Sequence, residues 1–141
     1  MANKIADEIR VQVRRRANLL CEYCHTSERW QYVRFTIDHV FPGGASSPEN
    51  LALACFHCNR RKSNKTEAID PETNELVEIF NPRRHLWKMH FAWSVDGLLI
   101  VPLTPIGRAT DALLELNRER ILFIRQADVV VNRHPPIDDL T

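Results

Sequence analysis

Apolar residues near the N-terminus recur at the spacing of an α-helix. Between about Asn3 and Leu20 the residues that follow this spacing are Ile5, Ile9, Val13, Ala17 and Leu20. They lie on one stripe of a helix with 3.6 residues per turn, and the arginines of this stretch lie largely off the stripe. The pattern therefore predicts an amphipathic helix over about residues 3–20.

The middle of the chain changes to shorter patterns. Aromatic and β-branched residues from Arg29 to Val40 are typical of a β-strand. Turn-forming residues predict a loop from Phe41 to Pro48. A short apolar segment, Leu51 to Ala54, then precedes a basic run from His57 to about Lys65 that we expect to be helical.

The C-terminal half begins with a turn at Asp70 to Asn74. Asn81 followed by Pro82 is typical of a helix start, which predicts a helix from Pro82 to about His90. A hairpin over residues 91–103 is indicated by Asp96-Gly97, and a last helix is expected from Thr104-Pro105 to about Gln126. Together these elements predict an α+β fold, organised as one composite domain over residues 1–141.

The overall composition narrows the class of protein. The chain has 141 residues, 44% hydrophobic and 26% charged, which is ordinary for a soluble globular protein with one modest core. No run of 18 apolar residues is present, so we expect no membrane-spanning helix. The first residues lack the apolar region of a secretory signal, and a cytoplasmic protein is the default expectation.

The formal net charge is only +1, but the basic residues are clustered. One cluster has no acidic residue within it and contains Arg60, Arg61, Lys62 and Lys65. A second contains Arg83, Arg84 and Lys88, flanked by His85 and His90. Such local patches suggest contacts with phosphate groups, and the alternative is that each is a solvated helix face.

All four cysteines lie in two Cys-x-x-Cys pairs, Cys21/Cys24 and Cys55/Cys58. Two residues between thiolates let one short turn present both sulfur atoms to a tetrahedral ion, and two such turns complete its coordination. Disulfides are disfavoured in a cytoplasmic chain, so we interpret the four cysteines as a structural zinc site. The alternative, four unrelated core cysteines, does not account for the pairing.

Several polar residues follow in a fixed order between and after the cysteine pairs. They are Asp38-His39, the Gly43-Gly44 loop, Asn50-Leu51, and Asn59 with Lys62 directly after the second pair. This order, from Cys21 to about Lys65, resembles the HNH endonuclease family. The segment from Phe80 to Thr110 looks similar to a bacterial subgroup of that family.

The resemblance implies a fold and an activity. The fold is a ββα-metal finger over about residues 21–65, stabilised by the four-cysteine zinc site, with an N-terminal helix and a C-terminal extension (hairpin plus helix) over about residues 80–127. The activity is metal-dependent hydrolysis of phosphodiester bonds in DNA, and the expected substrate is double-stranded DNA.

The resemblance also assigns roles to individual residues. It gives Asp38 to a catalytic divalent ion and His39 to the attacking water, and an imidazole with a pKa of about 6.5 suits a general base. Asn50 corresponds to the middle residue of the family pattern, and its side chain would brace the loop that carries His39. Asn59 stands where the family usually has a second histidine, and its amide oxygen can bind a hard cation. Because an amide binds transition metals less well than imidazole, we expect Mg²⁺ or Mn²⁺.

The expected partner is nucleic acid. The helix that begins near Asn59 would place its basic cluster beside the metal, and Arg83, Arg84 and His85 are the second candidates for DNA contacts. One alternative is a zinc-knuckle module that binds nucleic acid and whose catalytic metal site has decayed. Another is a nuclease or toxin that acts on RNA.

Overall fold

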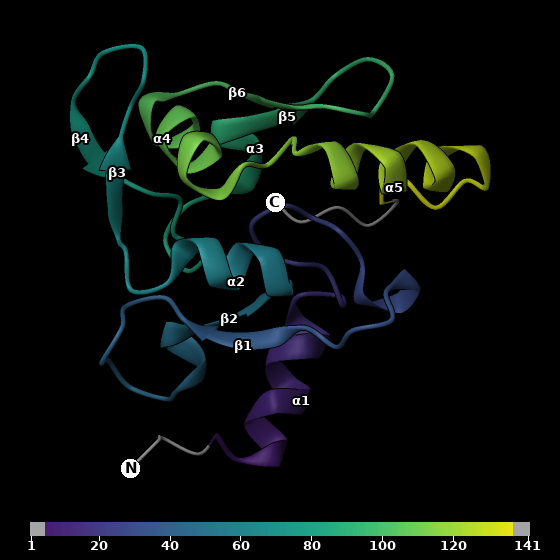
Figure 1. Ribbon diagram of the computed structural model, residues 1–141. Coiled ribbons are helices and arrows are strands. Elements are labelled where there is room, and N and C mark those ends of the chain that lie inside the picture. Colours follow the sequence, from purple (N-terminus) through teal and green to yellow (C-terminus); the bar gives the residue numbers. More distant parts are fainter. Residues whose placement is uncertain (1–4, 137–141) are drawn as a thin grey trace. The chain divides into compact units, whose positions relative to one another are not determined.

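The computed structural model describes residues 5–136, which form two compact units (Figure 1). Unit 1 comprises residues 5–66 and 81–84, and unit 2 comprises residues 67–80 and 85–136. The mixture of helices and strands confirms the α+β class. The expectation that residues 1–141 act as one composite domain stays a prediction.

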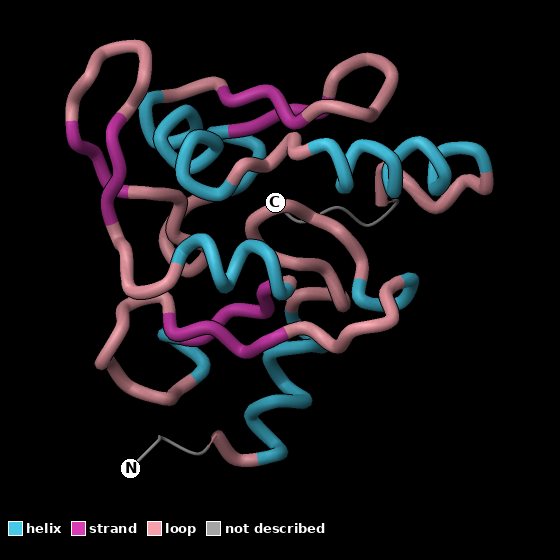
Figure 2. The backbone as a smooth tube through the Cα atoms, in the orientation of Figure 1, coloured by secondary structure: helices cyan, strands magenta, loops and turns pink. Residues whose placement is uncertain are grey.

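Unit 1 is built around a ββα arrangement (Figure 2). Strands β1 (Thr36–His39) and β2 (Leu51–Ala54) pair antiparallel, and helix α2 (Phe56–Lys62) follows β2 directly. The other elements of the unit are α1 (Asp7–Arg16), the 3₁₀ turn η1 (Glu28–Trp30) and the 3₁₀ turn η2 (Pro48–Asn50). The ββα finger expected over about residues 21–65 is therefore present, and its helix α2 carries the second cysteine pair at its start.

The core of unit 1 follows from the apolar pattern of its elements. All four residues of β2 are buried, as expected for a short, wholly apolar strand. The apolar stripe predicted for residues 3–20 is also largely buried: Ile5, Val13, Ala17 and Leu20 are each at most 5% exposed. Helix α1 contacts β2, so the first helix covers the strand that leads to the second cysteine pair.

Two predicted boundaries in unit 1 are wrong. The first helix ends at Arg16 instead of Leu20, because Asn18 and Leu19 take positive φ values of 54° and 60° and turn the chain toward Cys21. The strand begins at Thr36 instead of Arg29. Its partner β2 has only four residues before Cys55 caps α2, so β1 has four positions to pair with.

Unit 2 contains two antiparallel hairpins and three helices. The hairpins are β3 (Glu67–Ile69) with β4 (Leu76–Glu78), and β5 (Phe91–Trp93) with β6 (Ile100–Pro102). The helices are α3 (Trp87–His90), α4 (Pro105–Leu114) and α5 (Glu119–Val130). The expected turn at residues 70–74 joins β3 to β4, and the expected hairpin around Asp96-Gly97 forms with shorter strands.

Two predicted helices in this half of the chain differ from the structure in their extent. Of the helix expected from Pro82 to about His90 only Trp87–His90 forms (α3), and the Asn81 side chain instead accepts a hydrogen bond from Arg83 N at 2.9 Å in a turn that precedes it. Thr104 does cap α4, but the last helix divides into two. Glu115 takes a left-handed conformation, and the Asn117 side chain bonds to both the N–H and the carbonyl of Ile100 at 2.8 Å.

No helix within residues 5–136 has the length and apolar character needed to cross a membrane.

Candidate metal centre and cleft

The two cysteine pairs converge on one point in unit 1. The sulfur atoms of Cys21, Cys24, Cys55 and Cys58 lie within 4.8 Å of one another, and all four residues are buried. The Cys24 and Cys55 sulfurs are 3.7 Å apart. Four zinc–sulfur bonds of about 2.3 Å in a tetrahedron place sulfurs about 3.8 Å apart, so the cluster is positioned for a metal ion and suggests structural zinc.

The backbone of each pair supports such a centre. The amide of Cys24 donates to the sulfur of Cys21 at 3.5 Å, and the amide of Cys58 donates to the sulfur of Cys55 at 3.4 Å. Burial, with the neighbouring thiols, raises the pKa of Cys21 well above its usual range. Thiolates in this position therefore need a bound cation to compensate their charge.

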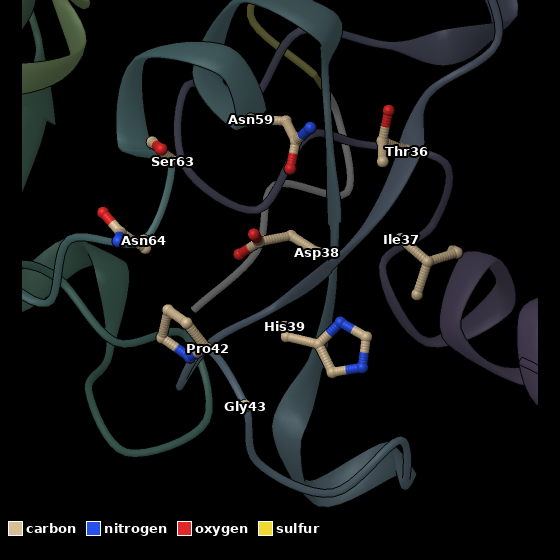
Figure 3. A pocket seen from close by; sticks show the side chains of 9 residues that line it. All are labelled: Thr36, Ile37, Asp38, His39, Pro42, Gly43, Asn59, Ser63 and Asn64. Carbon is tan, nitrogen blue, oxygen red and sulfur yellow. The ribbon is translucent and has the colours of Figure 1, made fainter. Parts of the chain in front are cut away.

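A cleft of about 530 Å³ lies beside β1 and α2 (Figure 3), and none of the four cysteines is among its lining residues. Asp38 and His39 from the end of β1, and Asn59 from α2, all line it. Pro42 and Gly43 of the following loop complete one wall. The structure thus brings the adjacent residues Asp38 and His39 together with Asn59, which follows some 20 positions later in the sequence.

Asp38 is buried and already has two partners. Its Oδ2 accepts a hydrogen bond from the Tyr23 hydroxyl at 2.9 Å and lies 3.3 Å from the Lys62 Nζ. Burial raises the pKa of Asp38 above its ordinary value, and the Lys62 ammonium and the Tyr23 hydroxyl oppose that shift. In Figure 3 the side-chain oxygen of Asn59 points toward the Asp38 carboxylate.

His39 is held by the loop that follows β1. Its Nε2 lies 2.9 Å from the hydroxyl of Ser46, which fixes the plane of the ring. Asn50 ties the same loop together: its Oδ1 accepts from Phe41 N at 3.0 Å, and its Nδ2 donates to the carbonyls of Phe41 and Ala45. Gly44 makes room for this, because a Cβ there would lie 2.7 Å from Asn50 Nδ2.

The basic residues of α2 divide into two groups. Arg60, Arg61 and Lys65 are exposed, in keeping with the expected surface cluster. Lys62 differs from the expectation, because it is only 1% exposed and its ammonium contacts Asp38 and the carbonyl of His39. Its position in α2 faces β1, the strand that carries Asp38. Because a buried ammonium needs a charged partner, it pairs with that carboxylate.

The second basic group is also only partly exposed. Arg83 pairs with the buried carboxylate of Glu22, which also accepts from Leu53 N at 2.8 Å, so this arginine ties the first cysteine knuckle to residues 81–84. His85, in unit 2, lies 3.2 Å from Glu78. Arg84 and Lys88 are the members of this group that are exposed. The DNA contacts expected of Arg83, Arg84 and His85 stay a prediction.

Tyr23, Ser46 and Glu22 were missed by the sequence analysis. Tyr23 and Glu22 lie between the two cysteines of the first pair, and nothing in a Cys-x-x-Cys motif specifies what its inner residues contact. Ser46 lies in a loop whose composition indicates only turns. The sequence offered one indication: Tyr23 and Glu22 are polar residues inside a motif expected to be buried, and buried polar side chains need hydrogen-bond partners.

The fold and the site define a class: a ββα module whose four cysteines are positioned for a metal ion beside a polar cleft. Within it, residues 19–65 match the HNH endonuclease family, which confirms the resemblance drawn from the motifs. A search of curated proteins and a search of solved structures gave no match. The match covers the four cysteines, β1, β2 and α2, and it points to a nuclease-type function.

Proposed function

We propose that the protein is a metal-dependent endonuclease that hydrolyses phosphodiester bonds in DNA, with His39 as the general base. The observation that carries the proposal is the single cleft lined by Asp38, His39 and Asn59 in the HNH segment. Metal-dependent hydrolysis of a phosphodiester needs oxygen ligands for the ion and a base for the attacking water. Asp38 and Asn59 can supply the ligands, and His39 can supply the base.

The donor set in the cleft fits a hard divalent ion. A carboxylate from Asp38 and an amide oxygen from Asn59 are the oxygen ligands that Mg²⁺ and Mn²⁺ prefer. When bound, such an ion relieves the negative charge of the phosphate and of the leaving oxygen. The four cysteines have the softer donor set of structural zinc, so we assign the two metals to separate places in unit 1.

His39 takes the proton of the attacking water in this proposal. The contact between Nε2 and Ser46 supports the role, because an Nε2–H donated to that hydroxyl leaves the lone pair on Nδ1 to accept a proton. Asn50 supports it indirectly, since its three hydrogen bonds hold the loop between His39 and Ser46. Asn50 and Ser46 are therefore positioning residues.

The substrate is proposed to be double-stranded DNA, bound mainly through its phosphates. The exposed Arg60, Arg61 and Lys65 lie on and just after the helix that contributes Asn59, and the exposed Arg84 belongs to the same unit. Binding through such contacts falls steeply as salt concentration rises. A cytoplasmic location is part of the same proposal, since DNA is available there.

The proposal is tested by nicking of supercoiled plasmid with Mg²⁺, with Mn²⁺ and without added divalent ion. Wild type is compared with His39→Ala, and His134→Ala serves as the matched control because His134 belongs to unit 2. We expect metal-dependent cleavage by wild type and by the control, and loss of at least about a hundredfold in His39→Ala, in the range attributed to a general base.

Each other outcome points elsewhere. Cleavage that survives in His39→Ala contradicts the assigned base. Salt-sensitive DNA binding by a wild-type protein that cleaves neither DNA nor RNA supports the binding-module alternative. Cleavage of RNA alone corrects the substrate.

A further inference from the structure

Lys62 is a buried lysine whose ammonium lies against Asp38, one of the residues that line the cleft. Its Nζ lies 3.3 Å from Asp38 Oδ2 and 3.5 Å from Asp38 Oδ1, and it donates to the His39 carbonyl at 3.0 Å. The side chain is 1% exposed. A buried ammonium is stable only with such compensation, so Asp38 holds Lys62 in place as much as Lys62 neutralises Asp38.

Both oxygens of the Asp38 carboxylate are therefore engaged. The Lys62 Nζ is close to both oxygens, and Oδ2 also accepts a hydrogen bond from the hydroxyl of Tyr23, a residue of the first Cys-x-x-Cys motif. The region in front of the carboxylate where a cation is most strongly attracted already contains a positive charge. A divalent ion bound to Asp38 and an ammonium about 3–4 Å from the same oxygens repel each other strongly.

From this geometry we propose that Lys62 lowers the affinity of the cleft for its divalent ion, because the ammonium and the ion compete for Asp38. The inference rests on the metal ligands of the proposed function and not on cleavage itself. Lys62 is in this view neither a DNA contact nor a metal ligand, but the residue that sets how much divalent ion the site requires.

The experiment measures binding of Mn²⁺ to the zinc-loaded full chain by electron paramagnetic resonance, which detects the free aqueous ion. Lys62→Met removes the charge and keeps the length of the side chain. Lys65→Met is the matched control, because Lys65 is exposed and follows the same helix. Asp38→Asn identifies which binding belongs to the cleft.

We expect Lys62→Met to bind Mn²⁺ at least about tenfold more tightly than wild type, a difference of about 1.4 kcal/mol. Lys65→Met should match wild type, and Asp38→Asn should lose the site. Lys62→Gln, which keeps a hydrogen-bond donor without the charge, gives the same test if the methionine variant does not fold. Circular dichroism establishes folding for each variant.

Equal or weaker Mn²⁺ binding in the folded Lys62 variants overturns the inference, and plasmid cleavage by the wild type would leave the proposed function standing. If Asp38→Asn binds Mn²⁺ as well as the wild type does, Asp38 is not a metal ligand, and both the inference and the metal ligands of the proposed function fail.

Discussion

At the scale of single residues, Ser46 controls the orientation of His39 through one hydrogen bond of 2.9 Å. We expect Ser46→Ala to lower the rate of plasmid nicking by about 10–100-fold, the usual effect of removing an orienting partner in a metal site. The melting temperature should change little, because Ser46 is in a loop and only partly buried. Ser47→Ala is the control, and equal rates for the two variants would show that the ring is oriented by something else.

The residues of the site differ in how far the sequence could predict them. The cysteines and Asp38-His39 are adjacent or regularly spaced, so their chemistry is visible locally. Tyr23 and Lys62 reach Asp38 from 15 and 24 residues away, and their pairing depends on how β1 packs against the knuckle and α2. A lysine in a basic run is normally a surface residue, and only the tertiary structure reveals that this one is buried.

At the scale of elements, the boundaries were the weakest part of the sequence analysis. Residues 29–35 have strand-like composition, but without a partner beyond Ala54 they cannot join the β1–β2 ladder. The apolar content of residues 104–126 does not reveal the division between α4 and α5, because it depends on Asn117 binding the backbone of Ile100. The signals at Thr104 and Asp96-Gly97 did mark a helix start and a hairpin, whereas the same kind of cap signal at Asn81-Pro82 marked only a turn.

Within unit 2, an ion pair joins the β3–β4 turn to α4. Arg108 donates two hydrogen bonds of 2.9 Å to the Asp70 carboxylate, and this guanidinium holds the pKa of Asp70 well below its ordinary value of about 3.9. A carboxyl group whose pKa is lowered by folding contributes stability above that ordinary value, and the contribution is lost as the pH falls below it.

We therefore expect Arg108→Gln to lower the melting temperature by several degrees at pH 7, because the buried carboxylate loses its partner. The difference from wild type should narrow as the pH falls below about 4, because the unfolded chain then takes up a proton on Asp70 and the contribution of the pair to the free energy of unfolding declines toward the lowered pKa of the folded state. Thermal melts at a series of pH values measure this, with Arg120→Gln, an exposed arginine of α5, as control. A difference that is constant with pH would contradict the proposed origin of the stability.

At the scale of the whole molecule, the two units have different sources of stability. Unit 1 encloses a cluster of four buried cysteines positioned for a metal ion. Unit 2 has its own apolar core, with Trp87, Phe91, Ile100, Leu114 and Ile121 each at most 3% exposed. A small fold that depends on metal loses its structure when the metal is removed, whereas a fold with a sufficient apolar core does not.

Metal removal should therefore act on the two units unequally. In a Trp30→Phe variant the remaining tryptophans, Trp87 and Trp93, both belong to unit 2, so their fluorescence reports that unit alone. We expect a chelator with a thiol-blocking reagent to release one zinc per chain and to lower the helical circular dichroism, while the emission of these tryptophans stays as it is in the untreated protein. Cys55→Ala should reproduce this state without the reagent, and His39→Ala should not. If emission and circular dichroism are lost together, the two units unfold cooperatively, and the prediction of one composite domain over residues 1–141 gains support from that result.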